Sequence, residues 1–186
     1  MEVTEYLANF EKRIQDELIA LCTSCKQLDG VLLSSEDVEA RWEALALDYM
    51  ADAVAQINEY PAVAVAWAGY LGMAVAHLWD EDWSAHSNDE YGSFYGENGF
   101  DDMDEHIMRD ILGVPLDAPR AKETEEVMRR CAYLLLSLIR HENIEPQSPM
   151  AYYTFARVVK VMYRIGAAIE LKKLGYKYEK LDLPTC

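Results

Sequence analysis

The chain contains few basic residues, and this scarcity excludes two classes of partner. It carries 17 lysines and arginines against 33 aspartates and glutamates, which gives a formal net charge of −16. A protein that binds nucleic acid needs a basic face to neutralise phosphates, and an anionic membrane surface attracts basic segments for the same reason. The sequence therefore predicts a protein that binds neither nucleic acid nor a membrane.

Basic residues are missing altogether from residues 42–108, a stretch that contains 14 acids. These carboxylates need solvent, a cation or basic residues from another part of the chain. Near the C-terminus, Arg157, Lys160 and Arg164 recur at helical spacing. We interpret them either as a solvated face or as a basic ridge that docks on the acidic middle of this chain or of a second copy.

Cysteine is also scarce, with four residues, at positions 22, 25, 131 and 186. A chain of this size with so few cysteines has no disulfide framework, and its first residues lack the pattern of a secretory signal. We expect reduced thiols in a cytoplasmic protein. Cys22 and Cys25 form a Cys-x-x-Cys pair in a helical pattern, without the βαβ context of a redox motif, and we interpret them as core residues.

Strand patterns, internal repeats and the common catalytic and nucleotide-binding motifs are absent as well. What the sequence does contain is helical periodicity, with apolar stripes that include Val54 and Tyr153. We predict one all-α domain over residues 1–186, a helical bundle of about five long helices and one short helix, with a frayed tail at 176–186. The predicted helices are 3–28, 36–59, 61–80, 102–112, 117–143 and 149–174.

Residues 61–79 are uncharged, and this run approaches the roughly 20 apolar residues that span a bilayer. Basic residues flank neither end, contrary to the usual pattern of spanning helices. Ala64, Ala68, Gly72 and Ala76 form a ridge of small residues, which lets a neighbouring helix approach closely. We therefore predict that this Ala/Gly-rich helix lies at the centre of the bundle.

Histidines and acids gather after this run and form the candidate chemical site. His77 has Asp80 and Glu81 at i+3 and i+4, on one helix face, and His86 and His106 follow within thirty residues. Imidazole and carboxylate groups together bind zinc, manganese or iron, and carboxylates alone suit magnesium or calcium. These five residues are the candidate ligands of a divalent metal ion.

A simpler interpretation is that these acids belong to solvated helix ends, although acids are unfavourable at a helix C-terminus. None of the familiar metal-binding spacings is present, which also favours the simpler interpretation. If a metal does bind, the protein is either a metal-dependent hydrolase, in which the ion activates water, or a protein with a structural metal site.

The segment 84–100 is predicted to be a long loop rich in glycine and aromatic residues. Loops of this length are often functional, and aromatic side chains are common in binding surfaces. The loop is a lid, a partner-binding surface or a cover over the open end of the bundle. Its candidate partner-binding residues are Tyr91, Phe94, Tyr95 and Phe100.

The functional hypothesis that we favour is association with protein rather than catalysis. The protein is expected to form a homodimer or to bind a partner through the acidic and aromatic segment 80–106. The alternative is the metal-dependent enzyme or structural metal site described above.

Overall fold

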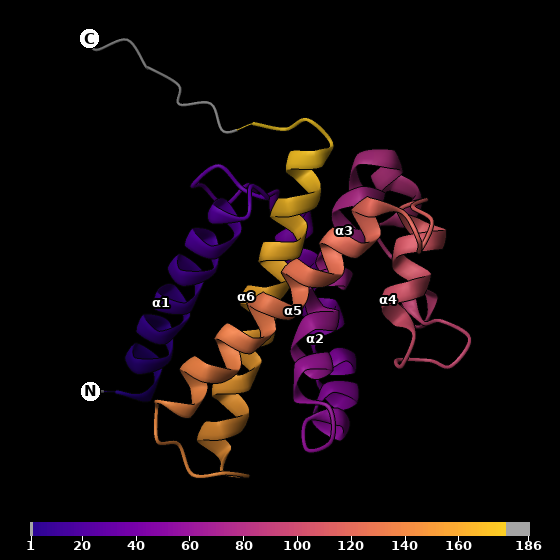
Figure 1. Ribbon diagram of the computed structural model, residues 1–186. Coiled ribbons are helices and arrows are strands. Elements are labelled where there is room, and N and C mark those ends of the chain that lie inside the picture. The colour runs from indigo at the N-terminus through magenta and orange to yellow at the C-terminus, as the bar shows by residue number, and fades with distance from the viewer. Residues whose placement is uncertain (1, 178–186) are drawn as a thin grey trace, which may run out of the picture.

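Over the residues that the structure describes, the protein is an all-α, single-domain bundle of five long helices and one short helix (Figure 1). The structure is a computed structural model and describes residues 2–177, so most of the predicted tail at 176–186 lies outside the described residues. Over that range it contains no strand, only an isolated bridge between Gly96 and Gly99. The helices are α1 (Val3–Ser24), α2 (Glu36–Gln56), α3 (Pro61–His86), α4 (Met103–His106), which continues into the π-helical turn η2 (Ile107–Ile111), α5 (Pro119–Arg140) and α6 (Pro149–Lys173).

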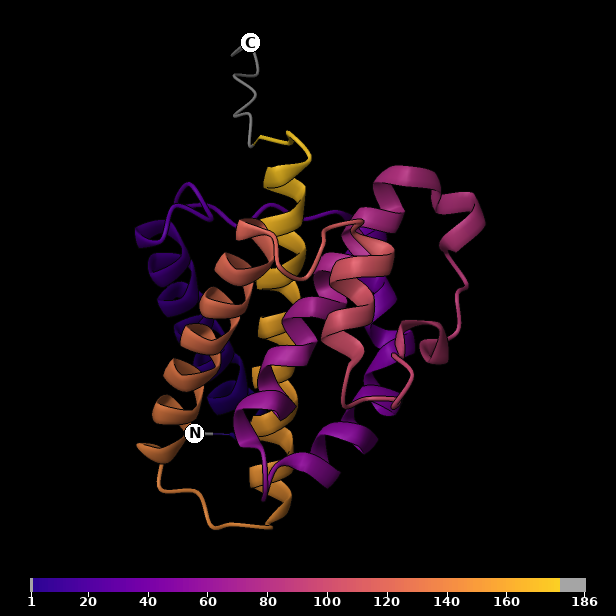
Figure 2. The ribbon, with the colours of Figure 1, turned by 45° about the vertical axis from the view of Figure 1, so that its right-hand side comes forward.

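Helices α3 and α6 pack against each other at the centre of the bundle (Figures 1 and 2). The predicted small-residue ridge of α3 is buried, and Gly72 faces the backbone of Tyr163 and Ala167. Gly166 of α6 lies against the backbone of Gly69 in the same way. Because glycine has no side chain, the two backbones come into direct contact at this crossing.

The central helix α3 is buried over most of residues 64–76. It packs on α2, α5, α6 and the short helix as well. Among the described residues it is the one helix long and apolar enough to cross a membrane, but 67% of its apolar window is buried inside the bundle. A helix that is apolar all round and covered in this way is typical of a protein core.

The first helix ends four residues earlier than predicted, at Ser24. Lys26 adopts the left-handed conformation (φ 64°), and the N–H of Gln27 donates to the carbonyl of Cys22. A residue in the left-handed conformation commonly ends a helix. Glycine at that position would have indicated the helix end in the sequence, whereas lysine does not. Two residues of the predicted buried stripes are exposed, Val54 by 43% and Tyr153 by 52%.

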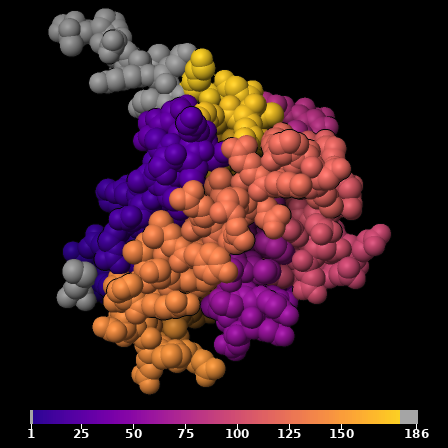
Figure 3. Space-filling view, in the orientation of Figure 1, coloured from indigo at the N-terminus to yellow at the C-terminus, as the bar shows by residue number. Residues whose placement is uncertain are grey.

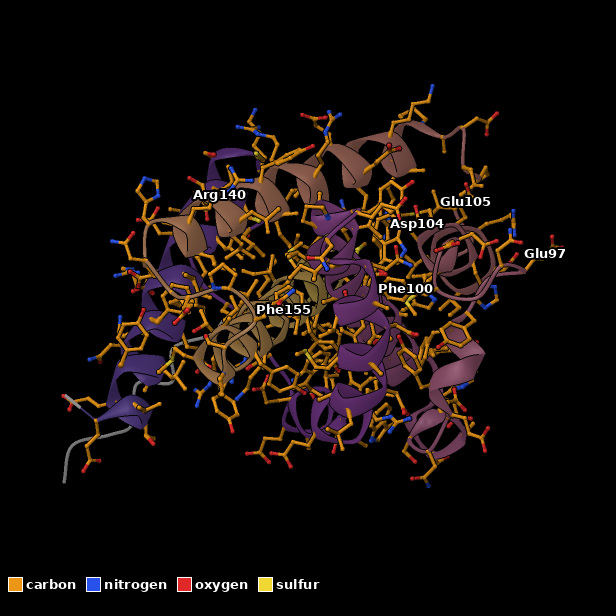
Figure 4. All side chains as sticks on the ribbon, turned by 90° about the horizontal axis from the view of Figure 1, so that it is seen from below. Glu97, Phe100, Asp104, Glu105, Arg140 and Phe155 are labelled. Atoms are coloured by element: carbon orange, nitrogen blue, oxygen red, sulfur yellow. The ribbon has the colours of Figure 1, made fainter. Side chains whose placement is uncertain are left out.

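The short helix and the loop before it form one edge of the molecule. The predicted loop at 84–100 begins inside α3, and it contains a 3₁₀ turn, η1 (Tyr91–Phe94). In Figure 4, Glu97 and Glu105 lie at the outer edge of this region, whereas Phe100 points into the interior. Arg140 lies toward the opposite side of the molecule.

Candidate functional site

His77, near the end of α3, belongs to a buried polar group from three helices. Its Nδ1 lies 3.4 Å from an oxygen of Glu170 on α6, and the other oxygen of Glu170 accepts a hydrogen bond of 2.7 Å from Arg120 on α5. Glu170 is only 1% exposed. Burial raises the pKa of Glu170, while Arg120 and His77 act in the opposite direction. The buried carboxylate of Glu170 therefore links α3, α5 and α6 through His77 and Arg120, whose side chains are partly exposed.

The three acids after His77 have three different environments. Asp80 accepts a hydrogen bond of 2.7 Å from the hydroxyl of Tyr176, and Glu81 is exposed. Asp82 leaves the helical conformation (φ −167°, ψ 90°), and its carboxylate accepts bonds from the hydroxyl of Ser84 and the N–H of Ala85. These bonds lower the pKa of Asp82.

The kink at Asp82 resolves the objection to acids at this position. Asp82 caps the N-terminus of the last turns of α3, where a carboxylate is favourable. The straight part of the third helix therefore ends after Glu81, close to the expected end near residue 80, and only Asp82 of the acid run lies beyond that end. The chain bends there and continues as helix to His86.

The other two candidate histidines have partners of their own. His86 Nδ1 lies 2.8 Å from a carboxylate oxygen of Asp89. His106 Nδ1 lies 2.9 Å from Asp110, and its Nε2 lies 3.1 Å from the carbonyl oxygen of Ser93. The structure thus gives His77, His86 and His106 a different carboxylate each. Within residues 2–177, no group of three or more His, Cys, Asp and Glu side chains is arranged to hold a metal ion.

The aromatic residues of the loop face the protein rather than solvent. Tyr91, Phe94 and Phe100 are at most 7% exposed, and Tyr95 is half-buried. The hydroxyls of Tyr91 and Tyr95 both donate to one oxygen of Asp52 on α2, at 2.9 and 2.5 Å. Burial and the neighbouring Asp52 raise the pKa of Tyr95 to about 12. In this arrangement the loop is a packed cover that is bonded to α2.

Beside this cover, α2 and residues 88–92 enclose an open cleft of about 500 Å³. Its rim carries the carboxylates of Asp48, Asp89 and Glu90, and Asp48 and Glu90 are exposed. Arg41 donates to the carbonyl oxygen of Asp89 and so ties the loop to α2. The cleft is therefore an acidic depression whose two walls are fixed to each other.

An exposed apolar strip runs along α2 next to the cleft. Leu47 is 79% exposed and Val54 is 43% exposed. With Ala44 and Ala51, which are also exposed, they recur at helical spacing. Figure 3 shows the surface around the end of α2 lying open between α5 and the segment that carries α4.

Charge is distributed unequally between the two sides of the molecule. Arg157, Lys160 and Arg164 all lie within 3.6 Å of Glu11 on α1, and Arg164 also donates to Glu39 at 2.7 Å. The basic ridge thus docks within the chain, but outside the acidic stretch 42–108. In the described part of the chain, none of the 14 carboxylates of that stretch forms an ion pair with a lysine or arginine.

Reasoning from the sequence missed both the cleft and the apolar strip. The strip had a signal, because Ala44, Leu47, Ala51 and Val54 share one helix face that is separate from the main stripe. The cleft had none, since it depends on where residues 88–92 pack.

The fold defines the class of the protein as a single-domain, all-α bundle. Comparison of the chain with known protein families, with curated proteins and with solved structures found no match.

Proposed function

We propose that the protein acts by association, and that its partner is a protein segment rich in lysine or arginine that binds the acidic cleft between α2 and residues 88–92. The observation that carries this proposal is the lack of basic counterparts for the carboxylates of residues 42–108 within residues 2–177. Opposite charges across an interface guide encounter and select the partner. A basic segment would supply the missing counterions.

The shape of the region supports the same partner. The cleft is open, and exposed Asp48 and Glu90 stand on its two sides. The adjacent Leu47 offers an apolar contact that the fold itself leaves uncovered. Such a combination of an apolar contact with a charged rim is common in protein interfaces.

A symmetric homodimer through this same face is less favoured, because a two-fold axis would place the acidic cleft opposite its own copy. Like charges that face each other across an interface cost several kcal/mol. A partner of opposite charge avoids this cost. Size-exclusion chromatography with light scattering separates the two cases, because a homodimer forms without any added basic peptide.

The test is to titrate the protein with decalysine and to measure the heat of binding by calorimetry, once at about 50 mM salt and once at about 500 mM salt. We expect binding at low salt that weakens strongly at high salt. The double variant Asp48→Asn with Glu90→Gln should weaken binding about tenfold or more, which is the scale of two lost charge contacts. Neither carboxylate is needed to hold the fold, since both are exposed.

The matched control is Glu5→Gln with Glu17→Gln on α1, which changes the net charge by the same amount at exposed positions. This variant should bind decalysine within about threefold of the unmodified protein, through the screened long-range field alone. Equal weakening by both double variants would show that net charge, and not the cleft, attracts the peptide. That result would overturn the proposal.

A further inference from the structure

Two thiols from different helices are in contact inside the bundle, and neither cysteine belongs to the acidic cleft. Cys22 of α1 and Cys131 of α5 are both 0% exposed, and their Sγ atoms are 3.5 Å apart. A disulfide bond has an S–S length of about 2.05 Å. The two sulfur atoms are therefore already in contact and must approach by about 1.5 Å to bond.

A third thiol, that of Cys25, directly follows the last residue of α1 and is within reach of solvent. Cys25 is half-buried, and Nη1 of Arg130 lies 3.1 Å from its Sγ. Cys22 and Cys25, at i and i+3, share a helix face. The three thiols thus run in order from the surface to the core.

We propose that Cys25, Cys22 and Cys131 form a thiol–disulfide exchange site, whose substrate is a low-molecular-weight disulfide and whose product is a Cys22–Cys131 disulfide. Cys25 is the entry thiol, because it is the only one of the three that is open to solvent. Cys131 is the final acceptor because it touches Cys22.

The reaction proceeds by three exchanges. The thiolate of Cys25 attacks the small disulfide, its S–S bond breaks, and the first small thiol leaves with a proton. Cys22 then attacks the sulfur of Cys25, which releases the second small thiol and forms Cys22–Cys25. Cys131 finally attacks Cys22 and returns Cys25 to the thiol. In sum, two protein thiols are oxidised and one small disulfide is reduced to two thiols.

The environment of the buried pair suits the middle of this sequence. The hydrogen bond from Cys131 lowers the pKa of Cys22, which is the thiol that must attack Cys25. The bond to Cys22 and burial raise the pKa of Cys131. Cys131 therefore gives up its proton only as it attacks Cys22, and that proton passes to the leaving sulfur of Cys25.

The experiment uses the full chain with Cys186→Ser, so that these three are the only thiols. The folded protein is incubated with glutathione disulfide, and thiol loss and disulfide links are followed by mass spectrometry of peptides. We expect a link between the peptides of Cys22 and Cys131. Cys25→Ser should slow its formation about tenfold or more, because the entry thiol is then missing.

Two further variants trap the intermediates, and they do not depend on rates. Cys22→Ser should accumulate a mixed disulfide between glutathione and Cys25, whereas Cys131→Ser should stop at Cys22–Cys25. The proposal is overturned if no Cys22–Cys131 link forms in the folded protein. It is equally overturned if Cys25→Ser forms that link at the rate of the parent protein.

Discussion

Replacing Gly166 with alanine tests the central crossing of α3 and α6. A Cβ at this position would lie 1.9 Å from the carbonyl oxygen of Gly69 and 2.6 Å from its carbonyl carbon. Carbon and oxygen atoms in contact normally lie about 3.3 Å apart, so the helices would have to separate locally by about 1.4 Å. The obstacle is backbone, which cannot rotate away as a side chain can.

The size of the effect follows from two opposing terms. Overpacking a core costs roughly 1–3 kcal/mol, occasionally more, and a backbone clash belongs at the top of that range. Alanine regains about 1 kcal/mol over glycine in a helix. We expect a net loss of about 2 kcal/mol or more in the free energy of unfolding, measured by urea denaturation followed by circular dichroism. The melting temperature should fall by about 4–8 °C.

Two other glycines serve as controls. Gly69→Ala would meet the ends of the flexible side chains Met128 and Met162, at 2.5 and 2.9 Å, and should cost less than Gly166→Ala. Gly92→Ala would meet no atom within 4 Å and should change stability by at most about 0.5 kcal/mol. If Gly166→Ala were as stable as the parent, or less damaging than Gly69→Ala, the close crossing would be refuted.

Three further predictions concern other parts of the bundle. Burial raises the pKa of Asp104 from 3.8 to about 6, so the folded state holds more protons than the unfolded state between these pH values and stability falls as pH rises through them. Asp104→Asn should therefore be about 1–2 kcal/mol more stable than the parent in urea at pH 7, after allowance for partial solvent access, and equal to it near pH 4; the same difference at both pH values would contradict this. The Cys22–Cys131 disulfide, with partners 109 residues apart, should stabilise by roughly 2–4 kcal/mol and raise the melting temperature by about 4–16 °C in a scan without reductant; an unchanged melting temperature would count against it. Tyr49→Phe removes a buried hydrogen bond of 2.7 Å to the carbonyl of Ala64 and should cost about 1 kcal/mol in urea denaturation, whereas Tyr60→Phe, at a 54% exposed position, should cost nothing measurable.

The helices could be predicted from the sequence because each must bury one apolar stripe, and the stripe repeats with the helical period. The ends of the helices were harder to predict from the sequence. The end of α1 depends on the conformation of Lys26, which its residue type does not reveal. The exposure of Val54 likewise depends on the absence of a neighbouring helix on that side of α2. Periodicity describes one helix at a time and is silent about its neighbours.

The contacts of the candidate chemical site also differ in whether they could be predicted from the sequence. The bond of His106 to Asp110 spans four residues inside the predicted helix 102–112, so helical spacing alone could have indicated it. The bond of His86 to Asp89 lies beyond the end of α3, in the predicted loop, and had no such signal. The contact between His77 and Glu170 joins two helices that are distant in the chain, and its register is set by packing. The cap formed by Asp82 depends on a kink and on a further helical segment to His86, where the sequence predicted a helix end near residue 80 and a loop from residue 84.

The distribution of charge supplies the strongest argument for a partner. The basic ridge of α6 could have neutralised the acidic stretch 42–108, yet it is paired with Glu11 and Glu39, which precede that stretch. Apart from Asp89, which bonds to His86, the carboxylates of the stretch instead bond to tyrosine, serine and amide groups, or face solvent. Such groups hold a carboxylate in place but do not cancel its charge, so repulsion among the acids persists in the folded chain. A basic partner in the cleft would relieve this repulsion and gain affinity from it.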